Sequence, residues 1–352
     1  MKKKYLVIIC VVLAVVVGLA VSQCGSEQGP RTEFSTAWQT DTVLGDGFDM
    51  RYVAQPDDYQ GQVRSTIIRQ RSDCGGSTGV LYIHGYNDYF FQADEARRWA
   101  DSCVHFYAVD LRKYGRSLMA GQTPYQTRDI SEYYADIDSA VAAMRKDGIR
   151  RAVLMGHSTG GLVASSYMGH KPDSIFKALV LNSPFLEWNM GGFMKNVAIP
   201  VVGTIGRVLP DIKISQGEAM SPYGESLLRG YHGRWTFNTD WKTLRPRKVE
   251  SSWLGAITRA QDDVRDGKIG VPVLLMHSDS SATGDVWTPK FQHADGVLNV
   301  DDMRLYGPKL GRDVTMETVP GAMHDIFLSD SAVIEDAYRR MFDWLRKEGM
   351  RQ

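Results

Sequence analysis

The chain has 352 residues, of which 43% are hydrophobic, 23% charged and 10% aromatic, the composition of a folded globular protein. With only four cysteines, this composition excludes a disordered tail, a collagen-like fibre and a small domain dense in disulfides. Basic and acidic residues number 41 each, and removing the first 24 residues takes away three lysines and leaves 38 against 41, which argues against a nucleic-acid partner.

The first 24 residues have the pattern of an export signal or membrane anchor. Three lysines at 2–4 precede an apolar stretch at 5–21. The lysines are expected to stay in the cytoplasm, which places the following chain outside the inner membrane. Residues 21–24 (Val-Ser-Gln-Cys) resemble a loose bacterial lipobox. Three outcomes therefore stay open: Cys24 is acylated, the anchor remains uncleaved, or the chain is secreted.

The rest of the chain alternates short apolar strands with helices. Strands are predicted at 38–43, 50–54, 62–70, 79–83, 104–109, 151–156, 178–181, 271–277 and 314–319, and helices at 92–102, 127–146, 160–167 and 334–345. This alternation indicates an α/β fold with a mostly parallel sheet that is covered on both faces. Between about residues 184 and 250 the pattern lapses, which indicates an insertion within one domain spanning 25–352.

One serine stands where a predicted strand passes into a helix. Residues 156–160 (Gly-His-Ser-Thr-Gly) fit the nucleophile-elbow pattern Gly-x-Ser-x-Gly, with an apolar strand before them and a helix after them. Residues 75–79 (Gly-Gly-Ser-Thr-Gly) match the same pattern, but they follow a polar loop and precede a strand, so we interpret them as a flexible connection. The context predicts Ser158 as a nucleophile, and the alternative is a plain strand-to-helix turn.

A histidine near the C-terminus is predicted to supply the base that Ser158 needs; the alternative is a satisfied surface histidine. A serine hydroxyl attacks only when a histidine removes its proton and an acid orients that histidine, and here both should follow the serine in the chain. His324 comes just after the last predicted strand. The developing oxyanion needs two backbone donors, for which the amides of Tyr86 and Thr159 are candidates. A simple strand-ending turn is the alternative reading of residues 84–85.

These motifs resemble those of the α/β-hydrolases, in particular the monoacylglycerol lipase and lysophospholipase group, also called serine aminopeptidase S33-like. The similarity extends from about residue 35 to the C-terminus and rests on residues 84–85 (His-Gly), 110–117 (Asp-Leu-Arg-Lys-Tyr-Gly-Arg-Ser), 156–161 (Gly-His-Ser-Thr-Gly-Gly) and 321–325 (Gly-Ala-Met-His-Asp). Lys113 departs from the family pattern by replacing a glycine, and Tyr114 by replacing a histidine. The resemblance implies an eight-stranded, mostly parallel sheet, with a cap formed by residues 184–250.

The resemblance leaves several candidates for the acid, which should follow the strand predicted at 271–277. Relatives place it about four residues past this strand, where the chain has Ser281. Residues 295–300 (Asp-Gly-Val-Leu-Asn-Val) resemble the run that begins at the acid, displaced here by an insertion. We therefore favour Asp295. The alternatives are Asp279, which lies nearest the strand, Asp285 and Asp301.

The resemblance implies a serine hydrolase, and the N-terminal segment predicts that it lies outside the inner membrane. It would cleave carboxylic esters, especially of acyl lipids, through Ser158, Asp295 and His324 and an acyl-enzyme. Apolar residues of the insertion would either hold an acyl chain or pack the cap on the core; they are Phe185, Trp188, Phe193, Val201, Val202, Ile205, Val208 and Leu209. The alternatives are a peptidase that holds a free amine with Glu187 or Glu218, and a non-catalytic binding protein. No cofactor or metal is expected, and the expected partners are a small ester or lipid and, at the N-terminus, a membrane.

Two cysteines beyond the N-terminal segment precede neighbouring strands. Cys74 and Cys103 come shortly before the strands predicted at 79 and 104. In the order usual for this fold, these strands lie side by side and are entered from the same edge. An oxidising compartment would permit a disulfide that closes a loop of about 30 residues. The alternative is a pair of buried free thiols.

Overall fold

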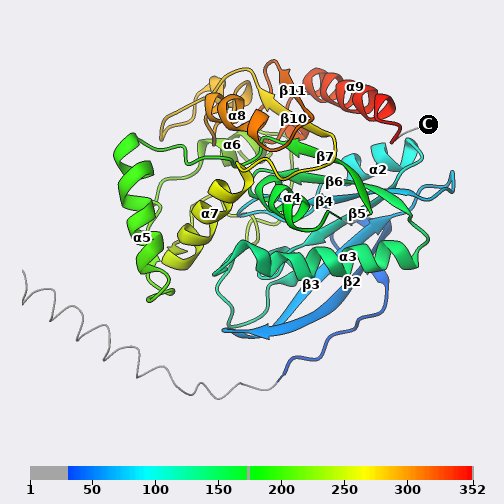
Figure 1. Cartoon of the computed structure of the whole chain (residues 1–352), viewed down its shortest axis with the longest axis horizontal. Coiled ribbons are helices and arrows are strands. Elements are labelled where there is room, and N and C mark those ends of the chain that lie inside the picture. The colour runs from blue at the N-terminus through cyan, green and yellow to red at the C-terminus, as the bar shows by residue number, and fades with distance from the viewer. Residues whose placement is uncertain (1–30, 173–174, 351–352) are drawn as a thin grey trace, which may run out of the picture.

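A nine-stranded sheet forms the centre of the protein in the computed structural model, which describes residues 31–172 and 175–350 (Figure 1). The export signal or anchor expected in residues 1–24 lies outside the described residues. In spatial order the strands are β1 (Gln39–Asp41), β2 (Gly45–Asp58), β3 (Gly61–Gln70), β5 (His105–Asp110), β4 (Thr78–Ile83), β6 (Arg151–His157), β7 (Phe176–Asn182), β10 (Val273–Ser278) and β11 (Val314–Val319). From β5 to β11 all neighbours are parallel. The α/β fold is confirmed, but the sheet has one strand more than the expected eight.

Helices cover both faces of this sheet. One face packs against α3 (Tyr134–Lys146), α4 (Thr159–His170), α7 (Ser251–Val264) and α8 (Val300–Tyr306), and the other against α2 (Ala93–Asp101) and α9 (Ser331–Lys347). Within β4, Leu81 and Ile83 face the first layer, whereas Val80 and Tyr82 face the second, since successive side chains of a strand point to opposite faces. Both faces are buried, which explains why the strands are continuously apolar in the sequence.

Several helical features differ from the prediction. Within the helix predicted at 127–146, the first part forms the 3₁₀ turn η2 (Ile130–Tyr133), and the α-helix α3 begins only at Tyr134. Asp129 starts this turn because its carboxylate accepts from the amide of Ser131 at 3.0 Å, while its own amide donates to Glu132 at 3.2 Å, a capping box. Helix α7 was not predicted; its Gly255 lies against the backbone of Gly203, where a Cβ atom would come within 2.7 Å.

The insertion at 184–250 is built from short elements. They are η3 (Met194–Ala198), α5 (Ile199–Ile205), α6 (Pro222–Leu227) and the two-stranded pair β8 (Lys213–Ile214) and β9 (Val249–Glu250). Figure 1 shows α5 at the outer edge of the molecule, with α7 between it and the sheet. Within the described ranges, no helix combines the length and apolar character needed to cross a bilayer.

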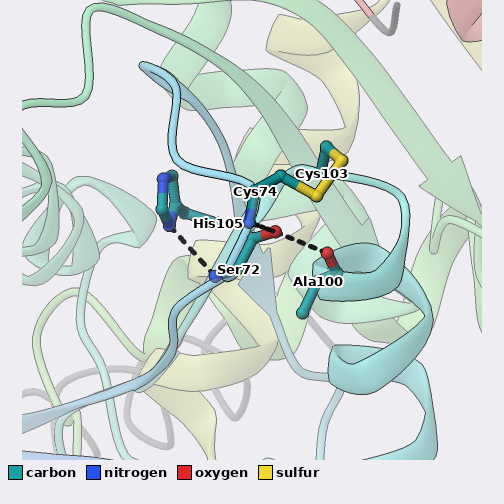
Figure 2. Close-up of a disulfide and its surroundings, with 5 residues drawn as sticks. All are labelled: Ser72, Cys74, Ala100, Cys103 and His105. Atoms are coloured by element: carbon teal, nitrogen blue, oxygen red, sulfur yellow. Dashed lines mark hydrogen bonds between the residues drawn. A yellow bond between two sulfur atoms is a disulfide. The ribbon is translucent and has the colours of Figure 1, made fainter.

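A disulfide joins Cys74 to Cys103, with the two Cα atoms 5.3 Å apart (Figure 2). The cysteines meet because β4 and β5 are parallel neighbours. The hydroxyl of Ser72 accepts from the amide of Cys74 at 3.3 Å and donates to the carbonyl of Ala100 at 2.6 Å. These contacts hold the segment before β4 against the end of α2, and the predicted pairing is confirmed.

Candidate active site

Ser158 occupies the sharp turn between β6 and α4, with φ of 53° and ψ of −119°. A non-glycine residue at positive φ costs about 1–3 kcal/mol and is found mainly where the surrounding structure imposes it. A Cβ atom at Gly156 would lie 2.5 Å from the carbonyl oxygen of Gly160, and one at Gly160 would lie 2.3 Å from that of Ile83. The flanking glycines are therefore required for the turn, which is the strand–turn–helix context that the elbow motif needs.

Ser158 and His324 line one cavity of about 490 Å³. The sheet side of this cavity includes Tyr86, which follows β4, and His157 at the end of β6. The opposite wall comes from the insertion and contributes Met220, Tyr223, Leu227, Phe237, Lys242 and Leu244. The mixture of apolar and aromatic side chains with a few polar groups is typical of small-molecule sites. Ser77, the serine of the second motif, lies outside this lining.

The imidazole of His324 is held by the carboxylate of Asp295. Nδ1 of His324 lies 2.9 Å from Oδ2 of Asp295, and both residues are buried. The other oxygen, Oδ1, accepts from the amides of Val297 and Leu298 at 2.9 and 2.8 Å. Because an ionised carboxylate only accepts, the hydrogen bond places the imidazole proton on Nδ1 and leaves Nε2 free to act as a base.

The position of Asp295 explains how an insertion can precede an acid without displacing it. Asp295 forms a parallel β-bridge with Ser281, the residue four positions past the predicted strand. Its amide donates to the carbonyl of Ser280 at 2.9 Å, and its carbonyl accepts from the amide of Ala282 at 2.8 Å. The intervening loop folds out and back and packs Phe291 in a small cluster of its own. The extra residues therefore lengthen the loop, whose end returns to its start, so that Asp295 lies beside Ser281.

The other three candidate acids have different surroundings. Asp279 accepts from the amide of Gly321 at 3.0 Å, so it fixes the start of the loop that carries His324. Asp301 is exposed and paired with Arg304 at 2.9 Å. Asp285 is exposed and lines the cavity. Only Asp295, among these four, contacts the imidazole.

The two candidate oxyanion donors belong to segments that lie next to Ser158. Thr159 is the first residue of α4, so its amide belongs to the unpaired donors at a helix N-terminus. Tyr86 lines the cavity, and a Cβ atom on the preceding Gly85 would lie 3.2 Å from Cβ of Ser158. His84 secures this loop because its Nε2 accepts from the amide of Leu111 at 3.1 Å.

Sequence reasoning missed the contacts that join the serine turn to the histidine loop. The carbonyl of Asn182, the last residue of β7, accepts from the amide of Ser158 at 3.0 Å. Its side chain donates to Asp325 at 2.8 Å and accepts from the amide of Ile326 at 3.2 Å. The sequence signals were an asparagine at a strand end and an aspartate directly after His324, and neither identifies its partner.

A buried ion pair also escaped the sequence analysis. Lys242 of the insertion donates to Asp88 at 2.9 Å and lines the cavity. Burial alone would raise the pKa of Asp88, but the ammonium of Lys242 and the nearby imidazoles of His84 and His157 keep it below its usual value. Burial also lowers the pKa of His157 to about 4, so this ring, 4.8 Å from that of His324 between centroids, is neutral near pH 7.

The two departures from the family pattern have a structural reason. Lys113 has φ of 65°, a conformation that favours the glycine usual there. Its side chain is fully buried and lies 2.6 Å from the carboxylate of Asp58, above the ring of Tyr59. Tyr114 is buried with its ring 4.8 Å from that of His84. An ion pair and an aromatic contact thus stand where relatives have a glycine and a histidine.

Two expectations about the substrate site are not met. None of the eight apolar residues proposed to hold an acyl chain lines the cavity at Ser158. Phe185 and Trp188 are buried against the core, whereas Phe193 and Val201 are exposed. The acids proposed to hold an amine also lie elsewhere: Glu187 pairs with Arg265 and Lys195, and Glu218 is an exposed residue outside the lining.

A family model described as serine aminopeptidase, S33, matches residues 77–331, more than half of the chain. The chain belongs to this family. It is a serine hydrolase of the α/β-hydrolase superfamily, and the family match covers both the turn at Ser158 and the loop at His324. Among the described residues, no group of three or more His, Cys, Asp or Glu is arranged to hold a metal ion.

Solved structures share the fold of this S33 family member at low sequence identity. A soluble variant of monoglyceride lipase from Saccharomyces cerevisiae is 17% identical, with a TM-score of 0.61 over 91% of this chain and 99% of that one. The monoacylglycerol lipase of Paleococcus ferrophilus is 18% identical, with a TM-score of 0.57 over 85% of this chain and 99% of that one.

Curated relatives match part of the chain. Epoxide hydrolase 4 of Mus musculus is 28% identical over 127 residues, which is 35% of this chain. Epoxide hydrolase 1 of Caenorhabditis elegans is 26% identical over 155 residues, which is 43% of this chain. The match spans only 34% of the length of each relative, so it supports common ancestry of this region and not a shared substrate.

Proposed function

We propose that this protein hydrolyses carboxylic esters of acyl lipids outside the inner membrane, with Ser158 as nucleophile, His324 as base and Asp295 as the orienting acid. The observation that carries the proposal is the 2.9 Å hydrogen bond between His324 and Asp295, in a cavity that Ser158 also lines. Ser158 has positive φ in its turn, and backbone strain of this kind clusters at functional sites. A monoglyceride lipase and a monoacylglycerol lipase share the fold, which supports the lipid ester as substrate class.

The mechanism follows the roles of these groups. Nε2 of His324 takes the proton of the Ser158 hydroxyl as Oγ attacks the ester carbonyl. The amides of Tyr86 and Thr159 donate to the oxyanion that forms. His324 then gives its proton to the leaving alcohol, and water releases the acid from the acyl-enzyme by the same steps. Asp295 holds the imidazole in one tautomer and stabilises the imidazolium throughout.

Location outside the inner membrane is supported by two independent features. Lysines at 2–4 and the apolar stretch at 5–21 have the order of an export signal or anchor. The disulfide between Cys74 and Cys103 is a feature of proteins in oxidising compartments. Retention at the membrane by the apolar stretch or by a lipid on Cys24 is part of the proposal.

A peptidase of the same mechanism is the second candidate. The family description names an aminopeptidase, and the exposed carboxylate of Asp285 in the cavity lining would suit a free amine. A panel of p-nitrophenyl esters, monoacylglycerols and aminoacyl-anilides tests the choice. We expect turnover of the esters, with preference for acyl chains that fill the cavity. Turnover confined to the anilides, and lost in Asp285→Asn, would favour the peptidase.

A further inference from the structure

A separate cavity of about 240 Å³ lies where the insertion meets the core. Arg128, Arg207 and Arg259 line it together with Ser252, and among the described residues its lining contains no aspartate or glutamate. We call this cavity the arginine pocket. It shares no lining residue with the cavity at Ser158, so a ligand in it would not compete with a substrate.

The arginine pocket forms because α5 lies unusually close to α7. A Cβ atom on Gly203 would lie 2.7 Å from Cα of Gly255, and one on Gly206 would lie 2.5 Å from the carbonyl oxygen of Ser251. These glycines let the end of α5 lie directly on the first turns of α7 (Figure 1). Arg207 follows immediately and lines the pocket, and within the described ranges it forms no ion pair.

Helix α7 contributes two polar side chains from one of its faces. Ser252 and Arg259 are seven residues apart, and Gly255 lies between them at the spacing of three and four residues that places side chains on the same face. A Cβ atom on Gly255 would lie 3.1 Å from Nη1 of Arg259, so the glycine leaves room for the guanidinium. Ser252 belongs to the first turn of this helix, where the helix dipole favours an anion.

The guanidiniums of Arg128 and Arg259 are held in place without using all of their donors. The guanidinium of Arg128 lies 3.8 Å from the centroid of the Tyr59 ring. The carbonyl of Arg128 accepts from Nη2 of Arg259 at 2.7 Å. The carboxylates of Asp211 and Asp129 lie 3.6 and 3.5 Å from these two guanidiniums, farther than in a direct hydrogen bond. Both arginines therefore keep N–H groups for a ligand.

Two buried polar atoms of the pocket residues have no partner. Ser252 is only 4% exposed, and its Oγ has no hydrogen-bond partner in the part of the chain that the structure describes. The same holds for Nε of Arg128. Buried polar groups are nearly always hydrogen-bonded, because an unpaired group loses the free energy of its contact with water. Both atoms can donate, so the missing partner is an acceptor.

We propose that the arginine pocket binds inorganic phosphate or the phosphate group of a small phosphate monoester. The forked donors of guanidinium groups match the oxygens of phosphate. Three arginines beside two carboxylates leave a net positive charge, which suits the charge of about −2 on a phosphate monoester. The phosphodiester of common phospholipid headgroups has a smaller charge and fewer free oxygens, so it matches this set of donors less well.

The test measures binding to the full chain by isothermal titration calorimetry at about pH 8, where the monoester is a dianion, and at constant ionic strength. We expect inorganic phosphate and glycerol 3-phosphate to bind and to raise the thermal unfolding midpoint, because a ligand of the folded state stabilises it. Acetate, a monoanion, should bind at least about tenfold more weakly. Absence of phosphate binding, or equal affinity for acetate, would overturn the proposal.

Variants assign the binding to the arginine pocket. Arg207→Gln and Ser252→Ala should each weaken phosphate binding about tenfold. Arg312→Gln changes an exposed arginine outside the pocket and should bind phosphate like the parent. Arg207 is exposed, so its variant should keep the parent's unfolding midpoint in the absence of phosphate. The same affinity in all three variants would contradict the proposal.

Vesicles of phosphatidylglycerol, which carry only phosphodiester headgroups, complete the test. We expect them not to displace glycerol 3-phosphate from the full chain. Binding confined to these vesicles, without binding of either soluble phosphate, would assign the arginines to a lipid surface and overturn the proposal. All of these measurements are made without turnover, so their outcome does not depend on whether the protein hydrolyses esters.

Discussion

The side-chain amide of Asn182 donates a hydrogen bond of 2.8 Å to the carboxylate of Asp325, the residue directly after His324. Asn182 also binds the amide of Ile326 through its Oδ1 and the amide of Ser158 through its backbone carbonyl. One residue at the end of β7 thereby sets the distance between the serine turn and the histidine loop. Gln92 adds a second donor to Asp325 at 3.2 Å.

Asn182→Ala should lower kcat more than it raises KM. The substitution removes one of the donors to the Asp325 carboxylate and the acceptor of the Ile326 amide, and small misplacements of catalytic groups cost up to about a hundredfold in rate. Each lost buried hydrogen bond should also remove about 1–3 kcal/mol of the free energy of unfolding. Ester kinetics and urea unfolding check both effects. A variant that loses stability but keeps kcat would reduce Asn182 to a purely structural role.

Asp295→Asn should reduce kcat by about a thousandfold or more, because an amide in this position no longer fixes the imidazole tautomer that leaves Nε2 unprotonated. Asp279→Asn is the matched control, since Asp279 contacts the amide of Gly321 and not the imidazole. We expect that control to keep kcat within about tenfold of the parent. The reverse order of the two losses would show that Asp279 is the acid.

The disulfide should contribute about 3 to 4 kcal/mol to the free energy of unfolding, the value that a loop of this length gives when loss of unfolded-chain entropy dominates. Cys74→Ser together with Cys103→Ser should lower the urea midpoint accordingly and leave ester turnover unchanged, because neither cysteine lines the cavity. A free-thiol count on denatured, unreduced protein provides the independent check: reactive thiols at both positions would contradict the bridge.

Glu95 should make the protein less stable as the pH rises. Burial raises the pKa of Glu95 well above its usual value, and the negative charges of Asp325 and Asp88 raise it further. The folded protein therefore keeps this proton above about pH 4.3, where the unfolded chain releases it, and the free energy of unfolding falls until the folded pKa is passed. At a pH below the pKa of Glu95 in both the folded and the unfolded state, its contribution to the free energy of unfolding does not change with pH.

Glu95→Gln removes this titration while keeping the shape of the side chain. We expect the variant to gain stability relative to the parent as the pH is raised from about 5 to about 8. Glu33→Gln, at an exposed position, is the control and should show no such trend. If the difference in the free energy of unfolding between the parent and Glu95→Gln is the same at both pH values, Glu95 ionises freely in the fold.

The sequence predicted features that depend on local patterns. The strands and the turn at Ser158 follow from apolar runs and glycine spacing. The order of serine and histidine follows from the architecture that these elements indicate, and the disulfide follows from the strand order of the family. The run that begins at Asp295 favours it over Asp279, although the bridge to Ser281 that holds Asp295 in place cannot be read from the sequence. Of the two roles left open for the apolar residues of the insertion, holding an acyl chain at Ser158 does not fit the cavity lining, because only the tertiary fold decides which part of the insertion faces Ser158.

Labelling by a fluorophosphonate tests the central claim most directly, because this probe reacts with a serine whose hydroxyl is activated by a neighbouring base. The full-length protein should be labelled once, and mass spectrometry should place the adduct on Ser158. Ser158→Ala should abolish labelling and lower turnover about a millionfold while keeping the unfolding midpoint of the parent, and Ser77→Ala should be labelled like the parent. Labelling that persists in Ser158→Ala, or that maps to Ser77, would contradict the assignment of the site.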